Sequence, residues 1–86
     1  MVRVIDQSPD FGQLQDFVDY LFRDDGQALL ARMEIVMQAE SYDMNPDLLE
    51  VVTLLPPGRY TRVKLCTQLN SSLSSHGWGY VYGTVE

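Results

Sequence analysis

The chain has 86 residues, a net charge of −6 and an apolar content of 45%, which together exclude a multidomain protein and an intrinsically disordered one. Its single cysteine, Cys66, excludes an intramolecular disulfide and a zinc site built from several cysteines. The sequence has no apolar run long enough to span a membrane and no signal-peptide pattern, so we expect a cytoplasmic protein.

The first 22 residues predict a short strand followed by a helix. Residues 2–6 carry β-branched apolar side chains, which favour a strand. Ser8-Pro9-Asp10 is a helix start, because serine can cap the helix, proline suits its first turn and an acid favours its positive end. Apolar residues then recur at three- and four-residue steps and predict one buried face: Phe11, Leu14, Phe17, Val18, Leu21 and Phe22.

Two further helices are predicted before residue 56. Asp24-Asp25-Gly26 ends the first helix and offers Asp24 or Asp25 as the cap of a second one, over residues 27–40. We expect its inward residues to be Leu29, Leu30, Met33, Val36 and Met37. Methionines can also form adaptable binding surfaces, but the pattern favours core packing. Asn45-Pro46-Asp47 opens a third helix, to residue 55, and its predicted inward face is Leu48, Val51, Val52 and Leu55.

The second half of the chain predicts a fourth helix and a strand. Pro56-Pro57-Gly58 stops the third helix, and it is the one plausible seam, between an acidic helical part and a basic helix-plus-strand part, in a single domain over residues 1–86. Arg59 and Tyr60 are expected to be extended. Thr61 caps a helix over residues 62–76, which ends at Gly77 and buries Leu65, Cys66, Leu69 and Leu73.

The tail over residues 78–85 alternates large and small side chains, which predicts a strand. A lone strand leaves its backbone groups without partners, and the strand over residues 2–6 is the natural one to pair with it. We therefore expect a mainly helical α+β fold, in which three to four packed helices accompany a small two-stranded sheet formed by the N- and C-terminal segments.

The sequence contains no recognisable catalytic or metal-binding constellation. His76 follows several serines, but no orienting acid or exposed nucleophile turn accompanies it. The acids near residues 24 and 43 lack the spacing of a calcium loop, and no glycine-rich turn leads into a helix as phosphate binding requires. We therefore predict no enzymatic activity, no bound metal and no organic cofactor.

The charge is distributed unevenly along the chain. Residues 1–50 carry eleven acids against three arginines, whereas the remaining residues carry three cations against one acid. An acidic surface can occupy a groove meant for nucleic-acid phosphates, as in anti-CRISPR and anti-restriction proteins of phages and mobile elements, although no motif assigns the chain to them. We expect a regulator or inhibitor that binds a protein with a basic, nucleic-acid-binding surface. The predicted contact residues are Asp16, Asp19, Tyr20, Asp24, Asp25, Glu34, Tyr42 and Asp43.

Two alternatives remain open from the sequence. The first is a winged-helix DNA-binding regulator that uses Arg59, Arg62, Lys64 and Asn70. Direct nucleic-acid binding is the less favoured reading, because three cations on a chain of net charge −6 make few phosphate contacts. The second concerns the contact surface, which the aromatic tail over residues 78–82 can also provide. A second copy of the chain is a further candidate partner.

Overall fold

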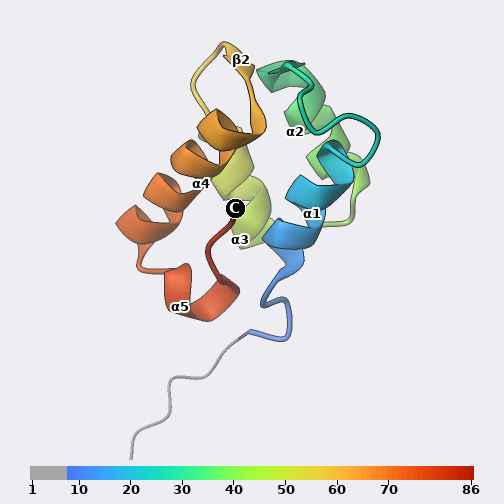
Figure 1. Cartoon of the computed structure of the whole chain (residues 1–86). Helices are drawn as coiled ribbons and strands as arrows, with labels where there is room; N and C mark the ends of the chain where they lie inside the picture. Colours follow the sequence, from blue (N-terminus) through green and yellow to red (C-terminus); the bar gives the residue numbers. More distant parts are fainter. Residues whose placement is uncertain (1–7) are drawn as a thin grey trace, which may run out of the picture.

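The computed structural model describes residues 8–86 (Figure 1). The elements within this range are α1 (Gln13–Leu21), β1 (Leu30–Ala31), α2 (Arg32–Ser41), α3 (Pro46–Thr53), β2 (Arg59–Tyr60), α4 (Arg62–His76) and α5 (Gly79–Tyr82). The predicted mainly helical α+β class is confirmed. The strand predicted over residues 2–6 lies outside the described residues.

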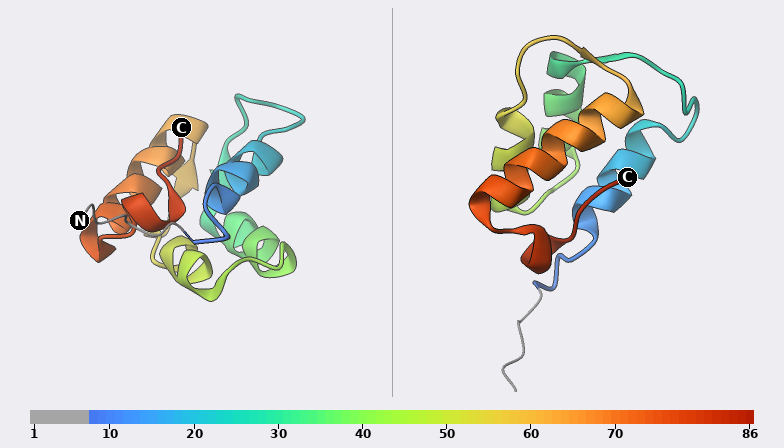
Figure 2. Two further views of the ribbon diagram at one scale, coloured as in Figure 1. Left: turned by 90° about the horizontal axis from the view of Figure 1, so that it is seen from below. Right: turned by 60° about the vertical axis from the view of Figure 1, so that its left-hand side comes forward.

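Helices α1 to α4 surround a common apolar core, and the C-terminal residues lie between α4 and α1 (Figure 2). The core is formed by Leu14, Phe17, Val18, Phe22, Ile35, Ala39, Met44, Leu48, Val51, Val52, Leu55, Tyr60, Leu65, Cys66, Leu69, Leu73, Tyr82 and Val85. None of the helices formed by residues 8–86 is long and apolar enough to cross a membrane.

Helices α3 and α4 begin and end close to where their local sequence predicts. Asn45 Oδ1 accepts a hydrogen bond from the Asp47 amide at 2.8 Å, and Thr61 Oγ1 accepts one from the Lys64 amide at 3.2 Å. Gly77 ends α4 in the left-handed conformation, with φ of 69°. All of the residues predicted to point inward from these two helices are buried.

The first helix starts later than predicted. Ser8 Oγ accepts a hydrogen bond from the Asp10 amide at 3.0 Å, but this bond closes a turn, and α1 begins only at Gln13. The reason is Gly12, whose φ of 87° interrupts the helical geometry. Phe11, which was predicted to lie on the buried face, is exposed, and its ring lies against Gly83 of the tail.

The second helix also starts late, at Arg32 and not at residue 27. Asp25 Oδ1 accepts a hydrogen bond from the Gln27 amide at 2.9 Å, so this acid stabilises a turn and caps no helix. The chain then runs extended, and Leu30 and Ala31 pair antiparallel with Tyr60 and Arg59. The two-stranded sheet is therefore formed by two segments from the middle of the chain. The prediction that the C-terminal segment forms one of its strands is wrong.

The inward face of α2 differs from the predicted one. Ile35 and Ala39 are buried, whereas Met33 and Met37 are 72% and 61% exposed, and Leu29 before the helix is exposed as well. The Arg32 side chain explains this orientation, because it donates to the carbonyl oxygens of Thr53 and Leu55, each at 2.6 Å, and so fixes the first turn of α2 against the end of α3. The expectation that both methionines pack in the core is wrong.

The tail predicted as a strand forms α5 and then an extended segment. Asn70 of α4 donates to the Val85 carbonyl and accepts from the Val85 amide, both at 2.8 Å. Gln15 of α1 makes the same pair of bonds to Glu86, at 2.9 and 2.8 Å. Two side-chain amides thus satisfy backbone groups that a neighbouring strand would otherwise pair, and the tail closes the gap between α1 and α4.

Candidate protein-binding site

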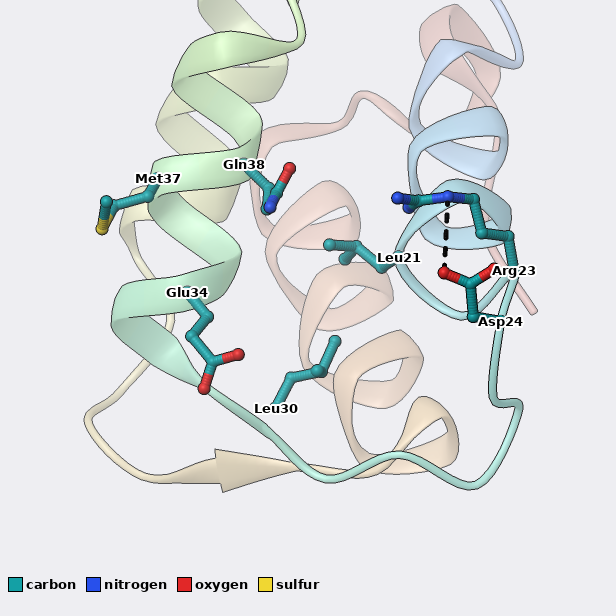
Figure 3. A pocket seen from close by; sticks show the side chains of 7 residues that line it. All are labelled: Leu21, Arg23, Asp24, Leu30, Glu34, Met37 and Gln38. Atoms are coloured by element: carbon teal, nitrogen blue, oxygen red, sulfur yellow. Dashed lines mark ion pairs between the residues drawn. The ribbon is translucent and has the colours of Figure 1, made fainter.

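A groove opens between the C-terminal end of α1 and the side of α2 (Figure 3). Its volume is about 320 Å³, and its floor is apolar, with Leu21 contributed by α1 and Leu30 by β1. Glu34 and Gln38 of α2 point toward this floor, while Arg23 and Asp24 stand on the opposite side. We call this site the α1–α2 groove; it is lined by Leu21, Arg23, Asp24, Leu30, Glu34, Met37 and Gln38.

The groove exists because the chain between α1 and β1 turns away from the core. Asp25 and Gly26 lie at the exposed end of this connection, and the sheet then brings Leu30 back beneath α2. Leu30 lies opposite Tyr60, which is buried and whose hydroxyl donates to the Pro56 carbonyl. Leu30 in the floor is therefore joined by strand pairing to a buried residue, although the connection between α1 and β1 is exposed.

The electrostatic character of the groove is negative. Asp24, Asp25 and Glu34 are exposed, and among residues 8–86 the only cation in salt-bridge range of these three acids is Arg23. Its Nε lies 3.9 Å from Asp24 Oδ2, and both side chains are largely exposed, so the pair contributes little stability. A cationic side chain of a partner can therefore bind Asp24 in place of Arg23 with little loss of stability.

Arg23 itself is held by Tyr20. Its Nη1 donates to the Tyr20 carbonyl at 2.6 Å, and its guanidinium lies 3.9 Å above the centre of the Tyr20 ring. The Tyr20 ring lies 5.4 Å from that of Tyr42, which in turn lies 5.3 Å from the buried ring of Phe17. The two tyrosines predicted as contacts are thus brought together, half-buried, behind Arg23.

The remaining predicted acids, Asp16, Asp19, Asp25 and Asp43, do not line the groove. Asp19 faces α4, where Arg62 Nη2 donates to its Oδ1 at 2.5 Å and Gln15 Nε2 donates to the same atom at 3.1 Å. The bond from Arg62, followed by that from Gln15, lowers the pKa of Asp19 below its ordinary value. Asp16 is exposed elsewhere on α1, and Asp43 occupies a left-handed turn between α2 and α3, with φ of 57°.

Sequence reasoning missed most of the groove, because it assigned the apolar lining residues to the core. Leu21 and Leu30 are only half-buried, and Met37 is largely exposed. The one signal available was the spacing of Met33 and Met37, one helical turn apart on a face that can serve adaptable binding. Arg23 and Gln38 gave no signal, since single polar residues on a helix or turn are usual at a surface.

Most of the four residues of the DNA-binding alternative make hydrogen bonds to other residues of the same chain. Arg62 holds Asp19 and donates to the Glu86 carbonyl at 2.8 Å, and both amide atoms of Asn70 bind Val85. Lys64 Nζ donates to the Arg59 carbonyl at 3.1 Å. Only Arg59 extends from the surface without such a bond among the described residues, and the tail forms no β-wing.

His76 and Cys66, the two side chains with the most reactive chemistry, make contacts within the fold. His76 Nδ1 lies 2.8 Å from the Ser72 carbonyl oxygen, and its ring stacks on that of Trp78 with centroids 4.3 Å apart. Cys66 lies buried on α4, and this burial raises the pKa of its thiol. Within residues 8–86, no cluster of three or more His, Cys, Asp or Glu side chains is arranged to hold a metal ion.

The α1–α2 groove thus combines an apolar floor, carboxylates on both sides and neighbouring exposed methionines. Comparison of the chain with protein-family models, with curated protein sequences and with solved structures found no match. The function must accordingly be inferred from the chemistry of the groove and its surroundings.

Proposed function

We propose that this protein is a small cytoplasmic interaction module that binds another protein through the acidic surface around the α1–α2 groove. In this role it regulates or inhibits a protein or complex whose binding surface is basic and normally engages nucleic acid. The observation that supports the proposal is the placement of Asp24 and Glu34 on opposite sides of an apolar floor. Asp25 follows Asp24 in the exposed connection, and Arg23 is the one cation within salt-bridge range of these acids among the described residues.

The physical basis is competition for a cationic surface. Exposed carboxylates attract the lysines and arginines that would otherwise neutralise phosphates, and the net charge of −6 steers such a partner from a distance. The apolar floor adds what a polyanion lacks, a surface that excludes water from the contact. Together these features favour a partner that releases nucleic acid when it binds this protein.

Charge reversal at the groove tests the proposal. The double variant Asp24→Lys and Glu34→Lys should capture at least tenfold less of the basic proteins that the immobilised parent chain retains, and added duplex DNA should elute them from the parent. The matched control is Glu40→Lys with Glu50→Lys, two exposed acids outside the groove lining, which changes the net charge equally. Equal capture by both double variants would contradict a site at the groove.

An electrophoretic mobility-shift assay with the isolated chain distinguishes the proposal from the DNA-binding alternative. The proposal predicts no shift of duplex DNA at physiological salt, because Arg62, Lys64 and Asn70 make their contacts within the chain. A salt-sensitive shift that disappears in Arg59→Ala would instead favour direct binding to nucleic acid.

A further inference from the structure

The exposed apolar surface next to the α1–α2 groove limits the shape of a partner that can bind there. Met33 and Met37 stand one turn apart on α2, and both are more than half exposed. Adjacent to this pair on the same helix, Glu34 and Gln38 form a second ridge, which faces Leu21 and Leu30 in Figure 3. The surface therefore runs along α2, with an apolar ridge beside an acidic groove.

A partner surface that fits this site must carry apolar side chains and cationic side chains next to one another. Methionine side chains are flexible and polarizable, so they accommodate differently shaped apolar partners. Glu34 and Asp24 require lysine or arginine, whose aliphatic stems can cover Leu21 and Leu30 while the charged ends reach the carboxylates. An amphipathic helix with cations flanking its apolar stripe presents both kinds of side chain at the required spacing.

Other geometries fit less well. Strand addition is disfavoured, because β1 and β2 have two residues each and pair with one another. A second copy of the chain is disfavoured by charge, since its own Asp24 and Glu34 would approach the same acids and each copy carries a net charge of −6. The ten residues of α2 extend over about 15 Å, a length that a partner helix of three turns matches.

We infer that the α1–α2 groove and the Met33–Met37 ridge bind a basic amphipathic helix of the partner protein. This inference rests on the proposed function and specifies the segment recognised. The apolar stripe of the helix packs on Met33 and Met37, and its flanking lysines or arginines reach Glu34 and Asp24. Arg23 moves from its long contact with Asp24 while keeping its bond to the Tyr20 carbonyl.

Two synthetic 18-residue peptides of identical lysine and leucine composition test the inference against the full chain. One peptide places leucines at helical steps of three and four, and the other distributes them evenly around the helix. The patterned peptide should bind at least tenfold more tightly in calorimetry, and amide shifts in the NMR spectrum should concentrate on residues 21–38. Met33→Ser with Met37→Ser should weaken it at least fivefold, whereas Val63→Ser, which alters an exposed residue of α4, should leave binding unchanged.

The outcomes separate the inference from the proposed function. Equal binding of both peptides, lost on charge reversal of Asp24 and Glu34, would overturn the inference and leave a charge-driven protein contact intact. Binding that the methionine variant does not weaken, or failure of the patterned peptide to bind, would also overturn it. Equally tight binding of a patterned peptide with glutamate in place of lysine would show that the surface recognises apolar residues alone, contrary to the inference.

Discussion

Asn70 shows how much a single polar side chain does in this small fold. It lies half-buried on α4, and its amide satisfies both backbone groups of Val85, as a neighbouring strand would. Gln15 does the same for Glu86 at the surface of α1. Tyr82 adds a third attachment, because its hydroxyl donates to Asp47 Oδ2 at 2.6 Å, a bond that raises the pKa of Tyr82.

Asn70→Ala should therefore lower the free energy of unfolding by about 2 kcal/mol, because it removes two hydrogen bonds and leaves partly buried backbone groups unpaired. Urea denaturation followed by circular dichroism measures this change. Asn70→Asp should also be destabilising, since its carboxylate can accept from the Val85 amide but places a second oxygen against the Val85 carbonyl. The control Ser71→Ala alters an exposed neighbour on α4, and a similar loss there would contradict the assignment.

The pairing of Asp19 with Arg62 predicts a dependence on pH. The pKa of Asp19 is lowered in the folded chain, so the pair stabilises the fold above the unfolded value of 3.8, and this contribution is lost as the pH falls through the lower folded value. Arg62→Gln should raise the pKa of Asp19 toward 3.8 in a carboxyl NMR titration. An unchanged titration of Asp19 would show that Arg62 does not hold it in solution.

At the scale of elements, the orientation of α2 depends on its contact with the end of α3. The guanidinium of Arg32 binds the carbonyl oxygens of Thr53, the last residue of α3, and of Leu55, two residues further along the chain. The same contact sets Ile35 and Ala39 inward and Met33 and Met37 outward. The structural link between α2 and α3 therefore creates the proposed docking surface.

Arg32→Ala should cost about 2 kcal/mol in unfolding free energy, because two charge-assisted hydrogen bonds are lost. It should also weaken binding of the patterned peptide, since the first turn of α2 carries Met33. The control Arg59→Ala removes an exposed cation that makes no side-chain hydrogen bond among the described residues. Wild-type stability of the Arg32 variant in thermal unfolding would contradict this role.

At the scale of the whole molecule, the residues after α5 join the first long helix, α1, to the last one, α4. The extended residues after α5 run between α1 and α4 (Figure 2). They contact α1 through Gln15 and α4 through Asn70 and Arg62, while Val85 is buried in the core. Helices from the two ends of the chain are thereby joined, so we expect cooperative unfolding of the whole domain.

Deleting Thr84–Glu86 should reduce the unfolding free energy by at least about 3 kcal/mol, from the lost burial of Val85 and the lost hydrogen bonds. Calorimetry should show a lower melting temperature and a broader transition. Thr84→Ala, an exposed change within the deleted segment, is the control. A truncated chain as stable as the parent would show that the tail is not part of the cooperative core.

The sequence alone determined those elements whose signals are local. Asn45 and Thr61 cap their helices through their own side chains, and Gly77 ends α4 through its own conformational freedom, so α3 and α4 were predictable almost to the residue. The exposure of the acids Asp24, Asp25 and Glu34 was implicit in the acidic surface predicted for the helices.

Only the tertiary structure decided the face of α2, the path of the tail and the place of the sheet. An apolar residue on a helix fits a core or an exposed face equally well, and the Arg32 side chain, bound to carbonyl oxygens at the end of α3, holds α2 with Met33 and Met37 exposed. Alternating large and small side chains fit a strand only where a partner strand is present, and here Asn70 and Gln15 pair with the tail after a short helix. The groove arises from these long-range contacts, whose energies depend on residues far apart in the chain.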